Sequence, residues 1–481
     1  MKGLVWFRRD LRLRDNPALS AACQECQDIV PLFVFDEPLL RSHAFGSACV
    51  GFMLGCLEEL RRSLALHGVS LAWRTGGPVE SVIQAASDFK VDAVYWNRDY
   101  EPAALERDRT VQQRLAQQGR TVRTFKDHVV FEAEEVRGQS GDPFQRYSAY
   151  RDRWWAKWRA AAPPLLGIPS FPPAGKASAS DSREWPSVAD LGYESVPMWI
   201  EPGEQAVHAR LQWFLGGPVH QYVTGRNLPA SDGTSKLSPH LRFGTISART
   251  LVHGALNALA QGGAVSRADV FTWIDELVWR EFFQQVLTAF PHVAQGPFKV
   301  KPGLPEPRPA GPERDRLFAA WSQGLTGYPI VDAGMRQLNQ TGWMHNRVRM
   351  VVASFLVKDL RIDWQSGERY FMERLVDGDL AANNGNWQWC ASTGTDAMPG
   401  YRIFNPRIQS EKFDAEGEYL RRYVPELKHV PTKWIHEPHL MPPLEQVQAG
   451  CRIESDYPEP IVDHRQARQE YLDLGKAPVK A

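Results

Sequence analysis

The residues best equipped for chemistry lie in one short stretch, residues 377–389, with the sequence DGDLAANNGNWQW. Two carboxylates, three asparagine amides and two indoles fall within these thirteen positions. Burying so many polar groups without hydrogen-bond partners is costly. We therefore expect this stretch to face a polar ligand that offers many donors and acceptors, and not an apolar core.

A second group shares one face of an expected helix, because Glu276, Trp279 and Arg280 stand at positions i, i+3 and i+4. An acid, a large flat ring and a guanidinium on one face suit a planar ligand that forms hydrogen bonds. The same three side chains also suit a surface patch whose members satisfy one another. Both interpretations remain open from the spacing alone.

Two further segments have chemistry of their own. Residues 233–239, GTSKLSP, place hydroxyls and backbone N–H groups just before a proline and a helical pattern, which suits phosphate oxygens. The alternative is an ordinary capped helix start. In residues 343–350, WMHNRVRM, Asn346 and Met350 stand four apart, a spacing most often found in a core.

Short apolar runs and helical patterns alternate along residues 1–130. This alternation predicts a parallel, doubly wound, Rossmann-like sheet with helices on both faces. G-x-G-x-x-G is absent after the first run, which argues against a nicotinamide dinucleotide domain. The expected strands are 4–7, 29–35, 69–73, 91–96 and 121–125, and the expected helices are 17–27, 49–66, 78–89 and 102–118.

The second half differs in pattern from the first. Residues 161–205 are linker-like, with Phe171, Gly175 and the run 178–180 among prolines and small residues. Helical spacing without comparable strand patterns then predicts an all-α domain. After Pro443 the chain is polar, and we expect it to end as a short tail. The expected parts are an α/β domain at 1–135, a linker at 136–205, a helical domain at 206–445 and a tail at 446–481.

Composition narrows the class of protein. The formal net charge is zero and charged residues make up 23% of 481, so a nucleic-acid site must be a local basic patch. No apolar run could span a bilayer and no signal peptide is expected, so we expect a cytoplasmic protein. The lone pair Cys23 and Cys26 is interpreted as structural, and no metal site is predicted.

The whole chain resembles the DNA photolyase/cryptochrome family, most closely its class I photolyases for cyclobutane pyrimidine dimers. The resemblance rests on residues 6–12 (WFRRDLR), 234–238, 276–283, 326–333 (TGYPIVDA) and 377–389. It implies FAD bound in the helical domain and an α/β domain that holds a second, antenna chromophore. The residues implied to hold FAD are Tyr222, Thr234, Ser235, Lys236, Leu237, Ser238, Trp273, Arg280, Arg349, Asp377, Gly378, Asp379 and Asn383.

The resemblance also implies roles within that set. Tyr222 and the 234–238 segment hold sugar and phosphates, and Arg349 pairs with Asp377 beside the flavin ring. Asn383 matches the residue that faces flavin N5, where an amide cannot readily give a proton away. Plant photoreceptors of the family carry Asp at this position, so the amide favours DNA repair over signalling.

The implied substrate is a dimer flipped out of damaged DNA, double- or single-stranded. The resemblance implies that Glu276 is a catalytic residue that hydrogen-bonds the pyrimidine edge, and that Trp279 and Trp389 form apolar walls. Asn346 and Met350 stand where (6-4)-type members carry His. The residues implied to contact DNA or the lesion are Arg226, Glu276, Trp279, Arg280, Asn346, Arg347, Met350 and Trp389.

The family's electron relay is matched in part. Trp387 and Trp364 match its first two members, and both are catalytic candidates for photoreduction of FAD. The third, exposed member aligns near Gly311 and is missing, whereas Trp321 matches a separate family tryptophan.

The antenna chromophore, folate or deazaflavin, is unresolved. The Asn-Glu pair of folate-binding members does not follow Tyr100 and Glu101, which argues against folate and leaves a deazaflavin, another flavin or an empty pocket open. We expect a monomer associated with the bacterial nucleoid through DNA, and no membrane partner. The main alternative function is a cryptochrome-like blue-light photoreceptor. A dark flavin oxidoreductase is a weaker alternative, because the sequence lacks a nicotinamide fingerprint and a substrate-facing acid/base pair.

Overall fold

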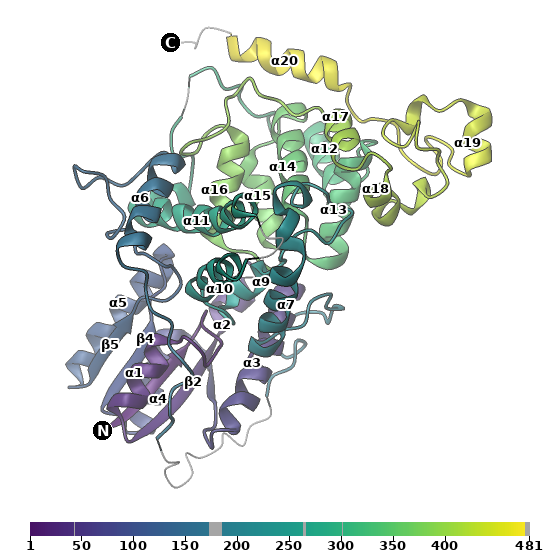
Figure 1. The fold of residues 1–481 in the computed structure, drawn as a ribbon. Coiled ribbons are helices and arrows are strands. Elements are labelled where there is room, and N and C mark those ends of the chain that lie inside the picture. Colours follow the sequence, from purple (N-terminus) through teal and green to yellow (C-terminus); the bar gives the residue numbers. More distant parts are fainter. Residues whose placement is uncertain (43, 173–184, 263–265, 301, 477–481) are drawn as a thin grey trace. The chain divides into compact units, whose positions relative to one another are not determined.

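The computed structural model describes all residues except 43, 173–184, 263–265, 301 and 477–481 (Figure 1). Gly175 and residues 178–180 of the expected linker therefore lie outside the described part. The chain forms two compact units. Unit 1 comprises Met1–His220, Ser235–Pro291 and Val376–Ala381, and unit 2 comprises Gln221–Thr234, His292–Leu375 and Ala382–Ala481.

Unit 1 contains a parallel sheet of five strands in the order β3-β2-β1-β4-β5. The doubly wound parallel sheet predicted from the sequence is confirmed, because the crossover from β3 to β4 reverses the direction of winding. The register pairs Leu4 of β1 with Val30 of β2 and Val94 of β4. The strands are β1 (Lys2–Phe7), β2 (Asp28–Asp36), β3 (Ala72–Gly76), β4 (Ala93–Asn97) and β5 (Thr121–Phe125).

Strand alternation separates the two faces of the sheet. Trp6, Leu32 and Trp96 belong to one core cluster with Ile83 of α4 and Leu115 of α5. The opposite face meets α1, where Cys26 donates from Sγ to the Tyr95 hydroxyl at 3.5 Å. The helices of this part are α1 (Pro17–Glu25), α2 (Glu37–Arg41), α3 (Ser47–Ala65), α4 (Pro78–Asp88) and α5 (Pro102–Gln117).

The rest of unit 1 is helical, with α11 as its longest helix. Pro-free apolar spacing over 23 residues and an Asp at the first turn suit this length, and Ser266 caps its start by accepting the Asp269 N–H. The helices are α6 (Tyr147–Ala160), α7 (Glu204–Gly216), α9 (Ser238–Phe243), α10 (Ala248–Ala260) and α11 (Arg267–Ala289).

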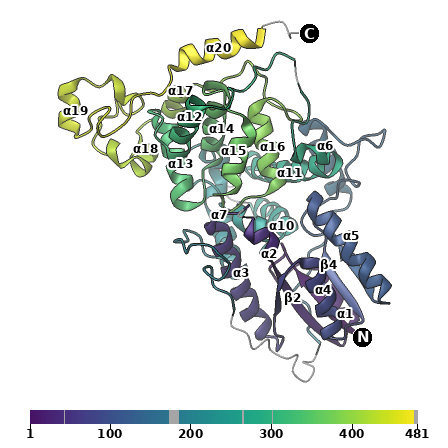
Figure 2. The same cartoon turned by 180° about the vertical axis from the view of Figure 1, so that it is seen from behind.

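Unit 2 is built on a helical core in which α12, α13 and α14 lie side by side in both views (Figures 1 and 2). Its buried cluster contains Trp321, Met344, Trp387 and Tyr457. The α-helices are α8 (Tyr222–Gly225), α12 (Pro312–Gln323), α13 (Pro329–Thr341), α14 (Asn346–Ser354), α15 (Trp364–Met372), α17 (Pro406–Phe413), α18 (Glu418–Tyr423), α19 (Pro443–Ala449) and α20 (His464–Lys476). Helix α16 (Leu380–Ala391) starts in the last segment of unit 1 and continues in unit 2.

Two expectations about regular structure differ from the fold. The expected linker 136–205 contains α6, whose Trp154 and Trp158 are buried. The expected polar tail after Pro443 contains two helices and the fully buried Cys451 and Tyr457. In the described residues, no helix combines the length and apolarity that a membrane span requires.

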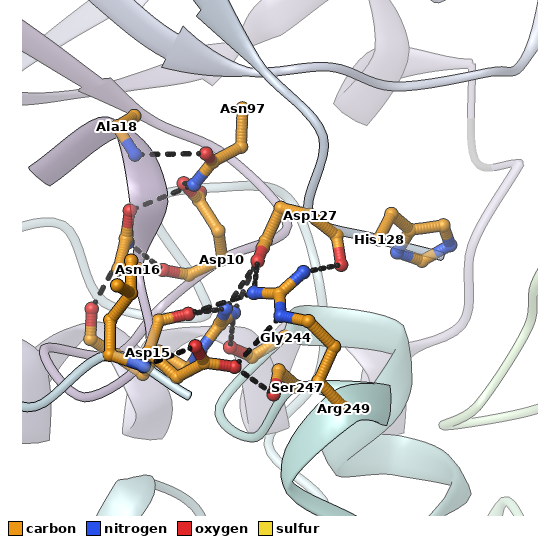
Figure 3. Close-up of polar contacts among 12 residues, drawn as sticks. Asp10, Asp15, Asn16, Ala18, Asn97, Asp127, His128, Gly244, Ser247 and Arg249 are labelled. Atoms are coloured by element: carbon orange, nitrogen blue, oxygen red, sulfur yellow. Dashed lines mark hydrogen bonds and ion pairs between the residues drawn. The ribbon is translucent and has the colours of Figure 1, made fainter. Parts of the chain in front are cut away.

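A buried polar cluster ties the sheet to α10 within unit 1 (Figure 3). Arg12, Asp15, Asp127 and Arg249 are each at most 4% exposed. Arg249 donates to Asp127 Oδ1 at 2.7 Å and to Asp15 Oδ2 at 3.0 Å. Arg12 also binds the Asp127 carboxylate and donates to the Gly244 carbonyl at 2.9 Å. Two cations and two anions thus compensate one another where the chain leaves β1, leaves β5 and enters α10.

Gly244 ends α9 in the left-handed conformation, with φ +62, pressed against the backbone after β1. A Cβ there would lie 1.9 Å from the Arg9 carbonyl oxygen. We expect Gly244→Ala to lower the free energy of unfolding by about 2–3 kcal/mol, because strain and a backbone collision add together.

The matched control is Gly119→Ala, since Gly119 has φ +73 but no atom within 4 Å of its Cβ position. It should cost about 1 kcal/mol from backbone strain alone. Urea unfolding of both variants measures the difference. An equal loss of unfolding free energy in Gly244→Ala and Gly119→Ala would show that the contact with Arg9 is unimportant.

Candidate functional site

Helix α11 carries four of the predicted residues, Trp273, Glu276, Trp279 and Arg280, all in unit 1. Trp273 is buried, and its ring lies 5.0 Å from that of Phe214. The other three are half-buried, as residues that both pack and contact a ligand would be. Trp279 stacks flat on Tyr147 of α6.

The loop after β5 holds α11 in place through two adjacent residues of the helix. Arg280 donates to the His128 carbonyl at 2.9 Å. Glu281 accepts the N–H groups of Val130 at 2.6 Å and Phe131 at 3.0 Å. Burial raises the pKa of Glu281 to about 7, against the opposing effect of these N–H donors. The loop thereby fixes the turn of α11 that bears Trp279 and Arg280.

Asp379 lies at the centre of a buried charge cluster in unit 1. Arg9 pairs with its carboxylate, and Gln284 donates to Oδ1 at 3.2 Å. Burial alone would raise the pKa of Asp379, but Arg9, His128 and Arg280 outweigh it and hold that pKa well below its usual range. Burial, with help from Arg280 and Arg9, lowers the pKa of His128 to about 3. The carboxylate is therefore ionised and the imidazole neutral at physiological pH.

Sequence reasoning missed Arg9, His128, Glu281 and Gln284 as members of this arrangement. Arg9 belongs to the 6–12 motif, so a signal existed, but its spacing does not say which carboxylate it meets. His128 stands alone after the last strand, and only the fold brings it to α11.

The predicted phosphate segment runs from unit 2 into unit 1. In unit 2, Gly233 lies against Gly225, so closely that a Cβ on Gly233 would be 2.6 Å from the Gly225 carbonyl oxygen. This approach brings Thr234 beside the helix α8 that begins at Tyr222. In unit 1, Arg210 donates to the Ser235 carbonyl at 2.9 Å, and the segment passes through Leu237 and Ser238 into α9.

Four predicted DNA-contacting residues occupy unit 2 on α8 and α14 or next to them. Arg347 donates to Asn227 Oδ1 at 2.6 Å, and its Nη1 lies 3.6 Å from the sulfur of Met350. Asn346 is exposed at the start of the same helix, and the Arg226 guanidinium lies 5.6 Å from the Tyr222 ring centroid. The structure therefore brings Arg226, Arg347 and Met350 to one region of unit 2.

The expectation that the amides of residues 377–389 need a ligand is wrong for most of them. Asn384 donates to the Val293 carbonyl and to Glu368 Oε1, both at 2.9 Å. Gln388 accepts the Phe298 N–H at 2.7 Å and donates to the Asn384 amide oxygen at 2.9 Å. Asn386 bonds back to the Ala382 carbonyl at 2.8 Å. These amides find partners within the chain, and Asn384 and Gln388 do so through a loop about 90 residues away in sequence.

Asn383 is buried, and the NH2 end of its amide is held by the backbone of α15. Its Nδ2 donates to the Glu368 carbonyl at 3.0 Å, and the residue is 8% exposed. The bond fixes the plane of the amide and assigns its oxygen as the remaining acceptor. Burial raises the pKa of the Glu368 carboxyl to about 7, although Asn384 opposes this.

The two predicted relay tryptophans, Trp387 and Trp364, lie in unit 2 together with Trp389. Trp387 is 2% and Trp364 7% exposed, and both belong to the main core cluster, on which the half-buried Trp389 packs. Gly367, one turn after Trp364 on α15, leaves room for Trp387, because a Cβ there would lie 2.2 Å from that ring. The predicted cofactor residue Arg349 also lies in unit 2, where it donates from Nε to the Met344 carbonyl at 2.7 Å.

The donor set fits FAD, which offers a diphosphate, sugar hydroxyls and a flavin ring with donors and acceptors on its edges. Buried carboxylates at Asp377 and Asp379 suit hydroxyl and ring N–H donors. The close approach of Gly233 and Gly225 forms a turn without side chains before the hydroxyl-rich Thr234 and Ser235, as close backbone approach to a phosphate requires.

Comparisons with known proteins also point to an FAD-binding protein. A family description for DNA photolyase matches residues 3–169, and one for the FAD-binding domain of DNA photolyase matches residues 273–477. The chain is 40% identical to a deoxyribodipyrimidine photo-lyase of Synechococcus, over 98% of this chain and 96% of that protein.

Two solved structures match the whole chain. One is a bacterial class III photolyase from Agrobacterium tumefaciens, with TM-score 0.86 and 35% identity over 98% of this chain and 96% of that one. The other is a cryptochrome from Synechocystis, with TM-score 0.87 and 30% identity over 98% and 99%. The chain therefore belongs to the DNA photolyase family and is an FAD-binding enzyme of that family.

Proposed function

We propose that this enzyme repairs cyclobutane pyrimidine dimers in DNA with blue light, and that binding to damaged chromosomal DNA places it at the nucleoid. When bound and reduced, FAD supplies a light-driven electron that opens the cyclobutane ring and is then recovered, so no net redox change occurs. The observation that carries the proposal is the pair Glu276 and Trp279 on one face of α11. An acceptor carboxylate beside a flat apolar ring suits a pyrimidine's polar edge and apolar face.

The other unit 1 residues orient that pair and bind the cofactor. Asp379 is ionised and anchored by Arg9, and Arg280 is fixed on His128, so α11 does not have to reorganise on binding. Asp377, Gly378 and Asp379 are proposed to accept from flavin and ribose donors. Trp273 and Arg280 are proposed to border the cofactor, with Ser235, Lys236, Leu237 and Ser238 at its phosphates.

The unit 2 residues have separate proposed roles. Arg226 and Arg347 would bind backbone phosphates, which gives salt-dependent affinity without base sequence preference. Asn346, Met350 and Trp389 would border the lesion, with Tyr222, Thr234 and Arg349 on the cofactor side. The Asn383 amide, fixed on Glu368, is proposed to accept a hydrogen bond from FAD without giving up a proton. Trp387 and Trp364 are proposed to carry electrons to oxidised FAD.

Light-dependent restoration of ultraviolet-irradiated oligothymidylate tests the function, with a dark sample as control. We expect Glu276→Ala and Trp279→Ala each to weaken binding of dimer-containing DNA by about 10- to 100-fold, the range for central contacts in an interface. Arg61→Ala, in an exposed ion pair with Glu58 on α3, is the matched control and should repair normally. Full activity of both site variants would refute the assignment.

The second candidate is a cryptochrome-like blue-light photoreceptor, which the likeness to the Synechocystis cryptochrome favours. It makes the opposite prediction in the same experiment. Such a protein would bind damaged and undamaged DNA equally and would leave the dimers intact under light.

A further inference from the structure

We propose that Tyr147, the first residue of α6, positions Trp279 and Glu276 for lesion recognition, an inference that rests on the proposed function. The rings of Tyr147 and Trp279 stack with centroids 3.5 Å apart and planes 8° apart. This is the shortest and among the flattest of the ring pairs recorded in the described residues. The phenol ring therefore lies flat against one face of the indole.

Tyr147 is itself held at both its edge and its hydroxyl. It is 7% exposed, and its ring meets Phe282 edge-on at 5.9 Å. Its hydroxyl donates to the Asp275 carbonyl at 2.9 Å. Phe282 and Phe283 also contact the Trp279 ring, at 5.7 and 5.5 Å. The indole thus has a rigid aromatic support on one side.

The hydroxyl contact acts on a different part of α11 than the stack does. Asp275 directly precedes Glu276, and in an α-helix its carbonyl also accepts the N–H of Trp279. Further along α6, Trp155 donates from Nε1 to Asp275 Oδ1 at 3.2 Å and Arg151 pairs with the same carboxylate at 3.7 Å. Helix α6 therefore holds α11 at Asp275, and also at Glu281, to which Trp154 donates from Nε1 at 2.7 Å. Tyr147 adds the stack on Trp279 to these contacts.

A stacked support changes what the indole can do for a ligand. A half-buried tryptophan without it would sample several rotamers, and binding would have to order them. With Tyr147 behind it, the ring presents one face in one orientation, so a pyrimidine that stacks there meets a preorganised surface. Tyr147 touches neither lesion nor cofactor in this arrangement and is a positioning residue, not a catalytic one.

Two substitutions separate the contacts. Tyr147→Leu removes the stack and the hydroxyl, whereas Tyr147→Phe keeps the stack and removes only the bond to Asp275. Trp155→Phe is the matched control, because it removes another contact of α6 with Asp275 but leaves the Tyr147 ring in place. All three are studied as full-length, FAD-loaded enzyme, with circular dichroism and FAD content confirming the fold.

We expect Tyr147→Leu to weaken binding of dimer-containing duplex about three- to tenfold, the range of an aromatic pair, without changing affinity for undamaged duplex. The repair rate at saturating DNA should stay the same. Tyr147→Phe should keep the affinity within about twofold of wild type, because the stack on Trp279 remains and the Asp275 carbonyl still accepts the Trp279 N–H. Equal loss in Trp155→Phe and Tyr147→Leu would overturn the proposal, because any loosening of α6 would then suffice.

Fluorine NMR of fluorotryptophan-labelled enzyme detects the contact between the Tyr147 and Trp279 rings without DNA or light. The Trp279 signal, assigned from its loss in Trp279→Phe, should shift in Tyr147→Leu and stay in place in Tyr147→Phe. An unmoved signal in Tyr147→Leu overturns the positioning role.

Binding of dimer DNA by Trp279→Ala separates the proposed function of α11 from the proposed role of Tyr147. If it binds dimer DNA normally, the proposed function of α11 fails. If it binds weakly while Tyr147→Leu binds normally, only the role of Tyr147 fails.

Discussion

Asp127→Asn should lower the free energy of unfolding by about 3–5 kcal/mol, the cost of breaking a buried ion pair by removing one partner. The variant keeps the shape of the side chain but removes the negative charge of the carboxylate that accepts hydrogen bonds from both Arg12 and Arg249. Asp127 is 3% exposed, so water cannot replace the lost charge. Urea unfolding followed by circular dichroism measures the loss.

The pH dependence checks the mechanism. Burial alone would raise the pKa of Asp127, but Arg12 and Arg249 outweigh it and lower that pKa to about 2. The stability that ionised Asp127 contributes is therefore fully present above its unfolded pKa of about 3.9 and is lost as the pH falls through the folded value. The difference in free energy of unfolding between wild type and Asp127→Asn should therefore narrow as the pH falls from about 5 toward about 2.

Glu80→Gln is the control for this prediction. Glu80 pairs with Arg114 on the surface, where both side chains are more than a third exposed. No measurable change in stability is expected, because solvent screens the pair. If Asp127→Asn were equally silent, the buried cluster would not hold α10 to the sheet.

Local patterns predicted the regular elements well, and failed where pairing or packing decides. The helix expected at 78–89 is α4, Pro78–Asp88, because proline at its start and apolar spacing are local signals. The strand expected at 69–73 is instead Ala72–Gly76. Val69 and Leu71 are buried, but the register with β2 extends through Arg74 and Thr75, which no local pattern marks. Helix α6 was missed because its tryptophans stand among charged residues, and Trp154 and Trp155 find their partners Glu281 and Phe271 on the distant α11.

The candidate residues divide in the same way. The face of Glu276, Trp279 and Arg280 follows from helical spacing alone, and α11 confirms that they share a helix. The amides after Asp379 could not be interpreted correctly, because their partners Val293 and Phe298 are distant in sequence. Counting polar groups shows that they need partners, but only the fold shows whether the chain supplies them.

Trp387→Phe should abolish light-driven reduction of bound FAD and leave repair by chemically reduced enzyme unchanged. The proposed relay needs an oxidisable indole at this position, and phenylalanine removes it while filling most of the same space. Trp387 has a closely fitted place, with Gly367 beneath it and Phe371 edge-on at 5.0 Å. Loss of the oxidised-flavin absorption band under blue light with an external thiol measures photoreduction. Dimer repair after dithionite reduction measures the second activity.

Trp321→Phe is the matched variant, because Trp321 is also fully buried and its ring lies 6.3 Å from that of Trp387 at 70°. Trp364→Phe should behave like Trp387→Phe, and Trp321→Phe like wild type, if Trp387 of α16 receives its electron from Trp364 of α15. The resemblance to the family places the missing third member near Gly311, which is the N-cap of α12. Photoreduction lost in Trp321→Phe but retained in Trp364→Phe would therefore move the second step to Trp321, whose ring also lies 5.7 Å from that of the half-buried Tyr370.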